Sequence, residues 1–101
     1  MIRLDSILDT EKGKNEYPAV KEGLLKRFVV DNLYHVSLEK ICKSYHVKNG
    51  YGTNTYTGVL REGVEVSELE LAMICDNGYS FFGGSSRINE DRSFQVEIWF
   101  D

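Results

Sequence analysis

The first third of the chain carries apolar residues at helical spacing. Val20, Leu24 and Phe28 recur at every fourth position, which is typical of one face of an amphipathic helix. Pro18 fits the first turn of such a helix, because its missing N–H costs nothing at that position. The charged segment 11–15 precedes it and predicts a loop. We therefore expect a first helix that begins near Pro18 and ends shortly after Phe28.

A second helix is predicted to begin after Ser37, which is a suitable N-cap residue. The apolar residues that follow fit a single helix face: Leu38, Ile41, Cys42 and Tyr45. The Asn-Gly pair at 49–50 is then typical of a tight type I′ turn. Alternating threonines in 51–60 predict a strand after that turn.

Residues 64–76 fit two interpretations. Apolar residues alternate with polar ones on both sides of a phase change near Ser67, as in a strand with a β-bulge. Ser67 and Glu70 could instead form the capping box of a short helix. The Asn-Gly pair at 77–78 is typical of a hairpin, so we favour the strand. The glycine- and serine-rich segment 83–92 predicts a polar loop able to contact a partner.

The clearest strand lies at 94–100. Its apolar residues point one way (Phe94, Val96, Ile98 and Phe100), and Gln95, Glu97 and Trp99 point the other way. The apolar positions in 2–8 fit either a helical turn or an edge strand. These elements predict an α+β fold in one compact domain, 1–101, with two N-terminal helices packed on one face of a small antiparallel sheet of three to five strands.

The composition is that of a small globular protein. The chain has 101 residues, of which 42% are hydrophobic, enough for one modest core. No apolar run approaches the roughly 20 residues of a membrane-spanning helix, and acids at Asp5 and Asp9 argue against a signal peptide. Two cysteines, Cys42 and Cys75, are too few for a disulfide framework. We expect a cytoplasmic protein with reduced thiols and no membrane contact.

Charge is distributed unevenly along the chain. Residues 1–48 hold nine Lys/Arg against seven Asp/Glu, whereas residues 49–101 hold three against nine. Segment 62–76 contains five acids and no base. Such a surface repels phosphate, so direct binding of nucleic acid is disfavoured. It would attract a partner protein with a basic surface.

The sequence contains no recognisable catalytic or cofactor-binding motif. Cys42 and His46 are four residues apart and would share a helix face, with His35 and Cys75 as further candidate ligands. A metal site or an activated thiol would require several of these groups to converge. Helical spacing places Cys42 on the core side, where a thiol is inert. We therefore expect no metal, no cofactor and no enzymatic activity.

The preferred hypothesis is a non-enzymatic protein-binding module. Aromatic and arginine residues are frequent anchors of protein interfaces, and acidic side chains would supply complementary charge. The candidate partner-binding residues combine these types: Glu65, Glu68, Glu70, Tyr56, Tyr79, Arg87 and Trp99. In its small size, acidic surface and lack of catalytic residues, the chain resembles small inhibitors from phages and other mobile elements, such as anti-CRISPR and anti-restriction proteins, and toxin-neutralising immunity proteins. The resemblance is one of composition and implies inhibition by occupation of a basic surface.

A small nucleic-acid-associated protein is the alternative. It would use a lysine-rich helix face made of Lys40, Lys43 and Lys48, with Arg27 nearby. The oligomeric state stays open, because an exposed edge strand or Trp99 could also pair with a second copy.

Overall fold

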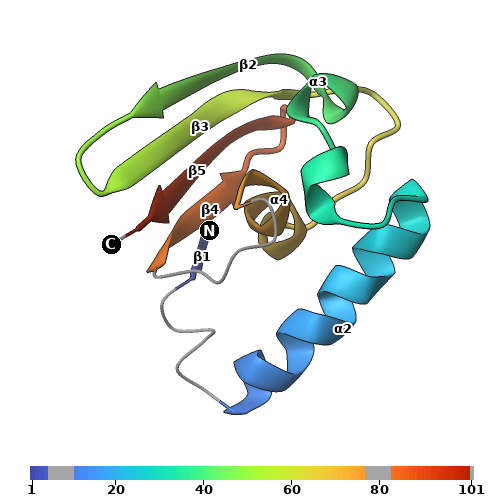
Figure 1. The fold of residues 1–101 in the computed structure, drawn as a ribbon. Coiled ribbons are helices and arrows are strands. Elements are labelled where there is room, and N and C mark those ends of the chain that lie inside the picture. The colour runs from blue at the N-terminus through green and yellow to red at the C-terminus, as the bar shows by residue number, and fades with distance from the viewer. Residues whose placement is uncertain (5–10, 77–82, 101) are drawn as a thin grey trace.

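The computed structural model describes residues 1–4, 11–76 and 83–100 and confirms an α+β fold with an antiparallel sheet. In chain order the elements are β1 (Ile2–Arg3), α2 (Glu11–Phe28), the 3-10 helix η1 (Leu33–His35), α3 (Leu38–Ile41), β2 (Cys42–Asn49), β3 (Thr53–Leu60), α4 (Glu68–Cys75), β4 (Gly83–Ile88) and β5 (Ser93–Trp99). The five strands lie in the order β1-β4-β5-β3-β2, and every neighbouring pair is antiparallel (Figure 1).

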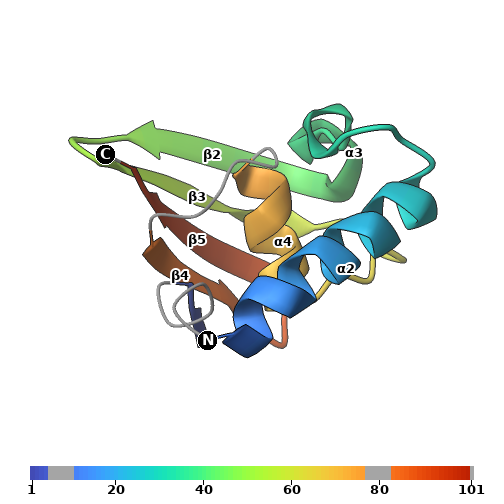
Figure 2. The ribbon, with the colours of Figure 1, turned by 60° about the horizontal axis from the view of Figure 1, so that its bottom comes forward.

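The helices form two layers on one face of this sheet. The short helix α4 lies against β4 and β5, and α2 lies outside α4 (Figure 2). The main helical partner of the sheet therefore comes from the middle of the chain. The predicted arrangement, in which two N-terminal helices pack directly on the sheet, is wrong in this respect.

Residues 68–75 form a helix, so the strand predicted over 64–76 is wrong. The Ser67 hydroxyl accepts a hydrogen bond from the Glu70 N–H at 3.1 Å, and Glu70 Oε1 accepts one from the Ser67 N–H at 2.8 Å. This reciprocal capping box fixes the start of α4. The first strand of the hairpin predicted around the Asn-Gly pair is therefore helical. The turn itself, at 77–78, lies outside the described residues.

Helix α2 is longer than its apolar stripe indicates. It begins at Glu11, so the predicted loop at 11–15 is helical, and Pro18 lies inside the helix rather than in its first turn. At the other end Val30 N–H donates to Leu25 O at 3.0 Å and Val29 N–H to Lys26 O at 3.2 Å. These bonds are those of a Schellman motif, which requires a left-handed residue. Val29 supplies it, with φ 55°.

The second predicted helix is a single turn. Ser37 caps α3 as expected, accepting a hydrogen bond from Glu39 N–H at 3.1 Å. The chain then changes to strand at Cys42, so Tyr45 is in β2 and not on a helix. The hairpin to β3 turns through Tyr51 and Gly52. Only Gly52 in it has a positive φ, 69°, so the turn is not the type I′ turn predicted at 49–50.

The segment predicted as a polar loop at 83–92 is largely strand β4. Gly84 has φ 136°, and a Cβ atom there would collide with the Glu97 carbonyl of β5. Close approach of the two strands therefore requires glycine at this position. Strand β5 follows the predicted alternation, with Phe94, Val96 and Ile98 buried, but it ends at Trp99 and leaves Phe100 exposed.

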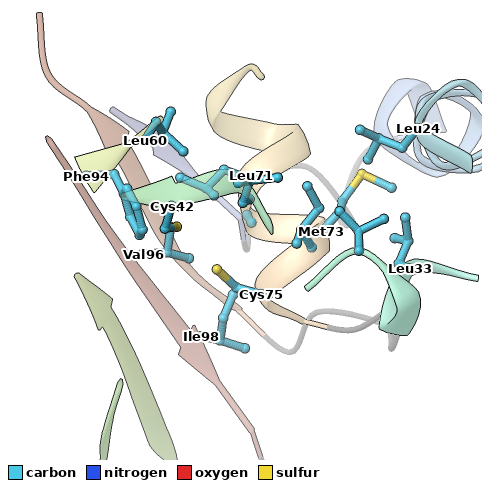
Figure 3. Packing of buried hydrophobic residues seen from close by; sticks show 14 of the residues in the cluster. Leu24, Leu33, Cys42, Leu60, Leu71, Met73, Cys75, Phe94, Val96 and Ile98 are labelled. Carbon is cyan, nitrogen blue, oxygen red and sulfur yellow. The ribbon is translucent and has the colours of Figure 1, made fainter. Parts of the chain in front are cut away.

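The core lies between the sheet and the helical layer. Figure 3 shows Cys75 of α4 pointing toward Val96 and Ile98, and Met73 pointing toward Leu24 of α2 and Leu33 of η1. Five consecutive residues of α4 are buried, Leu71 to Cys75. The helix is therefore enclosed on both sides by the rest of the fold.

Candidate binding surface

The sheet face opposite the helices is a surface that no described helix covers. Because Phe94, Val96 and Ile98 point into the core, the residues between them point the other way. Strand register extends this rule across the sheet and defines two rows of side chains, which we call the open face. One row is Arg3, Ser85, Glu97, Thr55 and Lys48, and the other is Arg87, Gln95, Thr57 and His46. Arg3 and Lys48 lie at the two ends of the first row, and Arg87 lies at one end of the second.

Trp99 lies on the open face beside these rows, opposite Thr53 of β3. Its indole N–H donates to Glu97 Oε1 at 2.6 Å. The Arg3 guanidinium lies 5.9 Å from the centre of the indole ring, within the range of a cation–π contact. Trp99 is thus half-buried and held in place by two polar neighbours, which prepares it to act as a rigid contact residue.

A small hollow of about 130 Å³ opens on the same face. Arg87 lines it together with Met1, Ser85 and Gln95. Arg87 and Gln95 are exposed and directly opposite each other on β4 and β5. Of the sequence candidates, the structure therefore brings Arg87 and Trp99 together on one face.

Glu68 and Glu70 instead hold the fold together at the start of α4. Glu68 accepts a hydrogen bond from Ile88 N–H at 2.8 Å and forms an ion pair with the N-terminal amino group at 3.2 Å. Glu70 caps α4 and forms an ion pair with Arg27 at 3.1 Å. No acidic strand exists here, because the segment is helical.

Glu65 lies in the connection between β3 and α4, at one end of the sheet. This connection is joined to the β4–β5 turn, since the Arg92 guanidinium donates to the carbonyls of Arg61 and Val64. Four exposed acids share this end: Glu62, Glu65, Glu90 and Asp91. They form an acidic edge distinct from the open face.

Tyr56 is on the helical side of β3, where it packs against the core. It lines a hollow of about 420 Å³ together with Tyr34, Tyr45 and other residues of η1, α3, β2 and α4. We call this the tyrosine hollow. Burial raises the pKa of Tyr56, so the phenol stays protonated. Tyr79 lies outside the described residues.

The end of α4 borders this hollow and carries two titratable groups, the buried Cys75 thiol and the half-buried Asp76 carboxyl. Burial raises the pKa of the Asp76 carboxyl to about 7 and raises that of the Cys75 thiol far above its ordinary value. Asp76 Oδ2 is buried and has no hydrogen-bond partner in the described structure. The Cys75 thiol is therefore protonated and unreactive at neutral pH.

Cys42 and His46 do not share a face, although residues four apart on a regular strand would, because the pairing of β2 with β3 is irregular between them. A bulge lies between Cys42 and Ser44, so Cys42 faces the core and His46 faces solvent on the open face. Burial raises the pKa of Cys42 to about 11. In the described part of the chain no group of three or more His, Cys, Asp or Glu side chains is placed to hold a metal ion.

Sequence reasoning missed most of the open face. Ser85 belongs to the segment interpreted as a loop, and His46 to the segment interpreted as a helix. The signal that was available is the alternation of polar residues in β3 and β5, Thr53, Thr55 and Thr57 against Gln95, Glu97 and Trp99. Two polar strand faces that lie side by side indicate a sheet face turned to solvent.

No protein-family model matches the chain, and no curated protein or solved structure is significantly similar to it. Among the described helices none is long and apolar enough to cross a membrane.

Proposed function

We propose that this protein is a non-enzymatic protein-binding module that contacts its partner through the open face. The observation that carries the proposal is the position of Trp99 and Arg87 on a sheet face free of described helices. Tryptophan and arginine are over-represented among the residues that dominate binding energy at protein interfaces. Serine, threonine and glutamine around them supply hydrogen-bonding groups for a polar interface.

A protein partner fits this face better than a nucleic acid does. Sheets that bind single-stranded RNA or DNA stack several bases on several aromatic rings. The open-face rows and their flank offer only Trp99 and, at the far end of the other row, His46, and Arg3 already lies over the Trp99 ring. Glu97 in the middle of the face would also repel phosphate.

The module would act by occupation, as an inhibitor or immunity-type protein does. The open face has Arg3, Lys48 and Arg87 at the ends of its rows and Glu97 between them. It would therefore favour a partner surface that has acidic groups around a hydrogen-bond donor. The acidic edge at Glu62, Glu65 and Glu90 would face any basic surface of the same partner. This differs from the sequence-based expectation, in which Glu68 and Glu70 supplied the contact, because both are engaged within the fold.

The proposal is tested by partner capture with a matched pair of variants. Tagged wild type is compared with Trp99→Ala/Arg87→Ala and with a control, Lys21→Ala/Lys26→Ala on α2, in nuclease-treated lysate of the source organism. We expect one stoichiometric protein that the open-face variant loses and the α2 variant retains. Far-ultraviolet circular dichroism checks that both variants fold.

Undiminished capture by the folded open-face variant would contradict the proposal. The alternative function, nucleic-acid association, would use exposed residues that do not form one helix face, because Lys40 is on α3, Lys43 and Lys48 are on β2, and Arg27 is on α2. Under that alternative, capture would vanish with nuclease and binding to nucleic acid would weaken steeply with salt.

A further inference from the structure

The outer edge of β2 presents backbone groups that no described strand pairs. Strand β2 is the last in the sheet order and has β3 as its only described neighbour. In Figure 1 no other described strand lies beyond it, and α3 is near its beginning. An unpaired edge of this kind can accept an additional strand.

Register identifies the residues that would make the new hydrogen bonds. Gly50 N–H donates to Thr53 O at 2.7 Å, and hydrogen-bonded pairs alternate along an antiparallel ladder. Lys48 and His46 therefore exchange bonds with β3, whereas Tyr45 and Val47 direct their N–H and C=O groups outward. An added strand would bind first at these two residues.

The side chains of the same two residues line the tyrosine hollow. Tyr45 and Val47 form part of its wall, and Tyr34 and Leu38 face them from η1 and α3. The hollow has a volume of about 420 Å³, which is large enough for more than one aliphatic side chain. Residues of an added strand that lie opposite Tyr45 and Val47 would point into it, because directly opposed side chains share a face.

The other face of β2 carries basic side chains, which would determine the charge of an added strand. His46 and Lys48 are exposed there, Lys43 is exposed at the bulge near the start of the strand, and Cys42–Asn49 contains no acid although the whole protein has a net charge of −4. The residues of an added strand that face His46 and Lys48 would therefore be acidic. A second copy of β2 fits poorly, because it would place two positive strands side by side.

We infer that the edge of β2 binds an extended segment of the partner protein in which apolar and acidic residues alternate. The segment would add an antiparallel or parallel strand beside β2, with its apolar side chains in the tyrosine hollow and its carboxylates beside His46 and Lys48. This inference rests on the proposed protein-binding function and names the chemistry of a second contact.

The test uses the full chain and a fluorescein-labelled peptide of about eight residues, the length of an ordinary strand, that alternates glutamate and valine. A peptide with lysine in place of glutamate is the control. We expect saturable binding of the glutamate peptide, weakening with salt, and no binding of the lysine peptide. Lys43→Glu/Lys48→Glu should weaken binding by about tenfold, and Lys21→Glu on α2 should not.

A backbone variant separates strand addition from side-chain packing. Val47→Pro removes one outward N–H, which an edge strand tolerates, and Val47→Ala removes the same side-chain contacts but keeps the N–H. We expect the proline variant to bind the glutamate peptide several-fold more weakly than the alanine variant. If the proline variant does not fold, backbone amide hydrogen exchange in the wild type provides the same test, with slower exchange at Tyr45 and Val47 when peptide is bound.

Absent or charge-independent peptide binding, or peptide-induced protection away from β2, would overturn the inference. The proposed function would survive that result if capture still depended on Trp99 and Arg87. It would fail if no protein were captured by the wild type.

Discussion

Asp76 is the residue whose surroundings conflict most with its ordinary charge. It follows the last residue of α4, and its Oδ2 is buried without a hydrogen-bond partner in the described structure. Burial raises its pKa to about 7 from the model-compound value of 3.8. Its carboxylate also faces Tyr17, whose pKa is raised to about 12 by burial and by Asp76. A charged Asp76 therefore destabilises the native state.

We predict that this conflict makes stability fall with rising pH. Between about pH 4 and pH 7 the native state holds the Asp76 proton and the unfolded state does not, so unfolding releases a proton. The free energy of unfolding should decrease through this window and level off above it. The free energy of unfolding of Asp76→Asn should match that of the wild type near about pH 4. At pH 8 it should exceed the wild-type value by on the order of 2 kcal/mol.

Urea denaturation across this pH range is the measurement. Asp91→Asn is a useful contrast, because the Ser93 hydrogen bonds lower the Asp91 pKa and its contribution is lost as the pH falls. A difference between Asp76→Asn and wild type that did not change with pH would contradict the assignment.

At the scale of the element, α4 explains why sequence patterns failed in the middle of the chain. A helix that faces the sheet on one side and α2 on the other has no polar stripe, so the 3.6-residue period is absent. Leu69, Leu71 and Met73 then mimic the alternation of a strand. The capping box at Ser67 and Glu70 was the one local signal of the helix, and a competing turn signal at 77–78 outweighed it.

Strands β2 and β4 were missed for related reasons. Leu38, Ile41, Cys42 and Tyr45 satisfy a helical spacing although the helix ends at Ile41, because all except Tyr45 pack on or beside the core. Strand β4 has one β-branched residue, Ile88, and no aromatic residue, whereas a typical strand is rich in both types. Its Gly84 is required by the close approach to β5, which the sequence of one strand does not reveal.

The end of α2 offers a prediction at the same scale. Val29 is β-branched, 88% exposed and left-handed at φ 55°, a conformation that glycine adopts without strain. Val29→Gly should therefore stabilise the protein by about 1 kcal/mol. Thermal unfolding of the variant should show a higher midpoint than the wild type. A lower midpoint would contradict this prediction. It would show that the contacts of the valine side chain stabilise the protein more than its left-handed backbone conformation destabilises it.

At the scale of the whole molecule, the fold class and most of the core were predictable. Leu24, Ile41 and Val96 are buried as their periodicity indicates, because burial follows the apolar pattern even where the type of element is misjudged. The binding surface was less predictable. Arg87 and Trp99 lie on the same face only because β4 pairs with β5, and Glu68 and Glu70 form contacts within the fold with residues distant in the sequence.

The central claim is that the partner sits on the open face, and hydroxyl-radical footprinting of the captured complex tests it most directly. The rate of side-chain oxidation would be compared between free and bound protein. We predict that Trp99 is oxidised several-fold more slowly in the complex, because an interface excludes water from its central residues. Phe28 on α2 should change little. Unchanged oxidation of Trp99 together with protection of the helical layer would contradict the account.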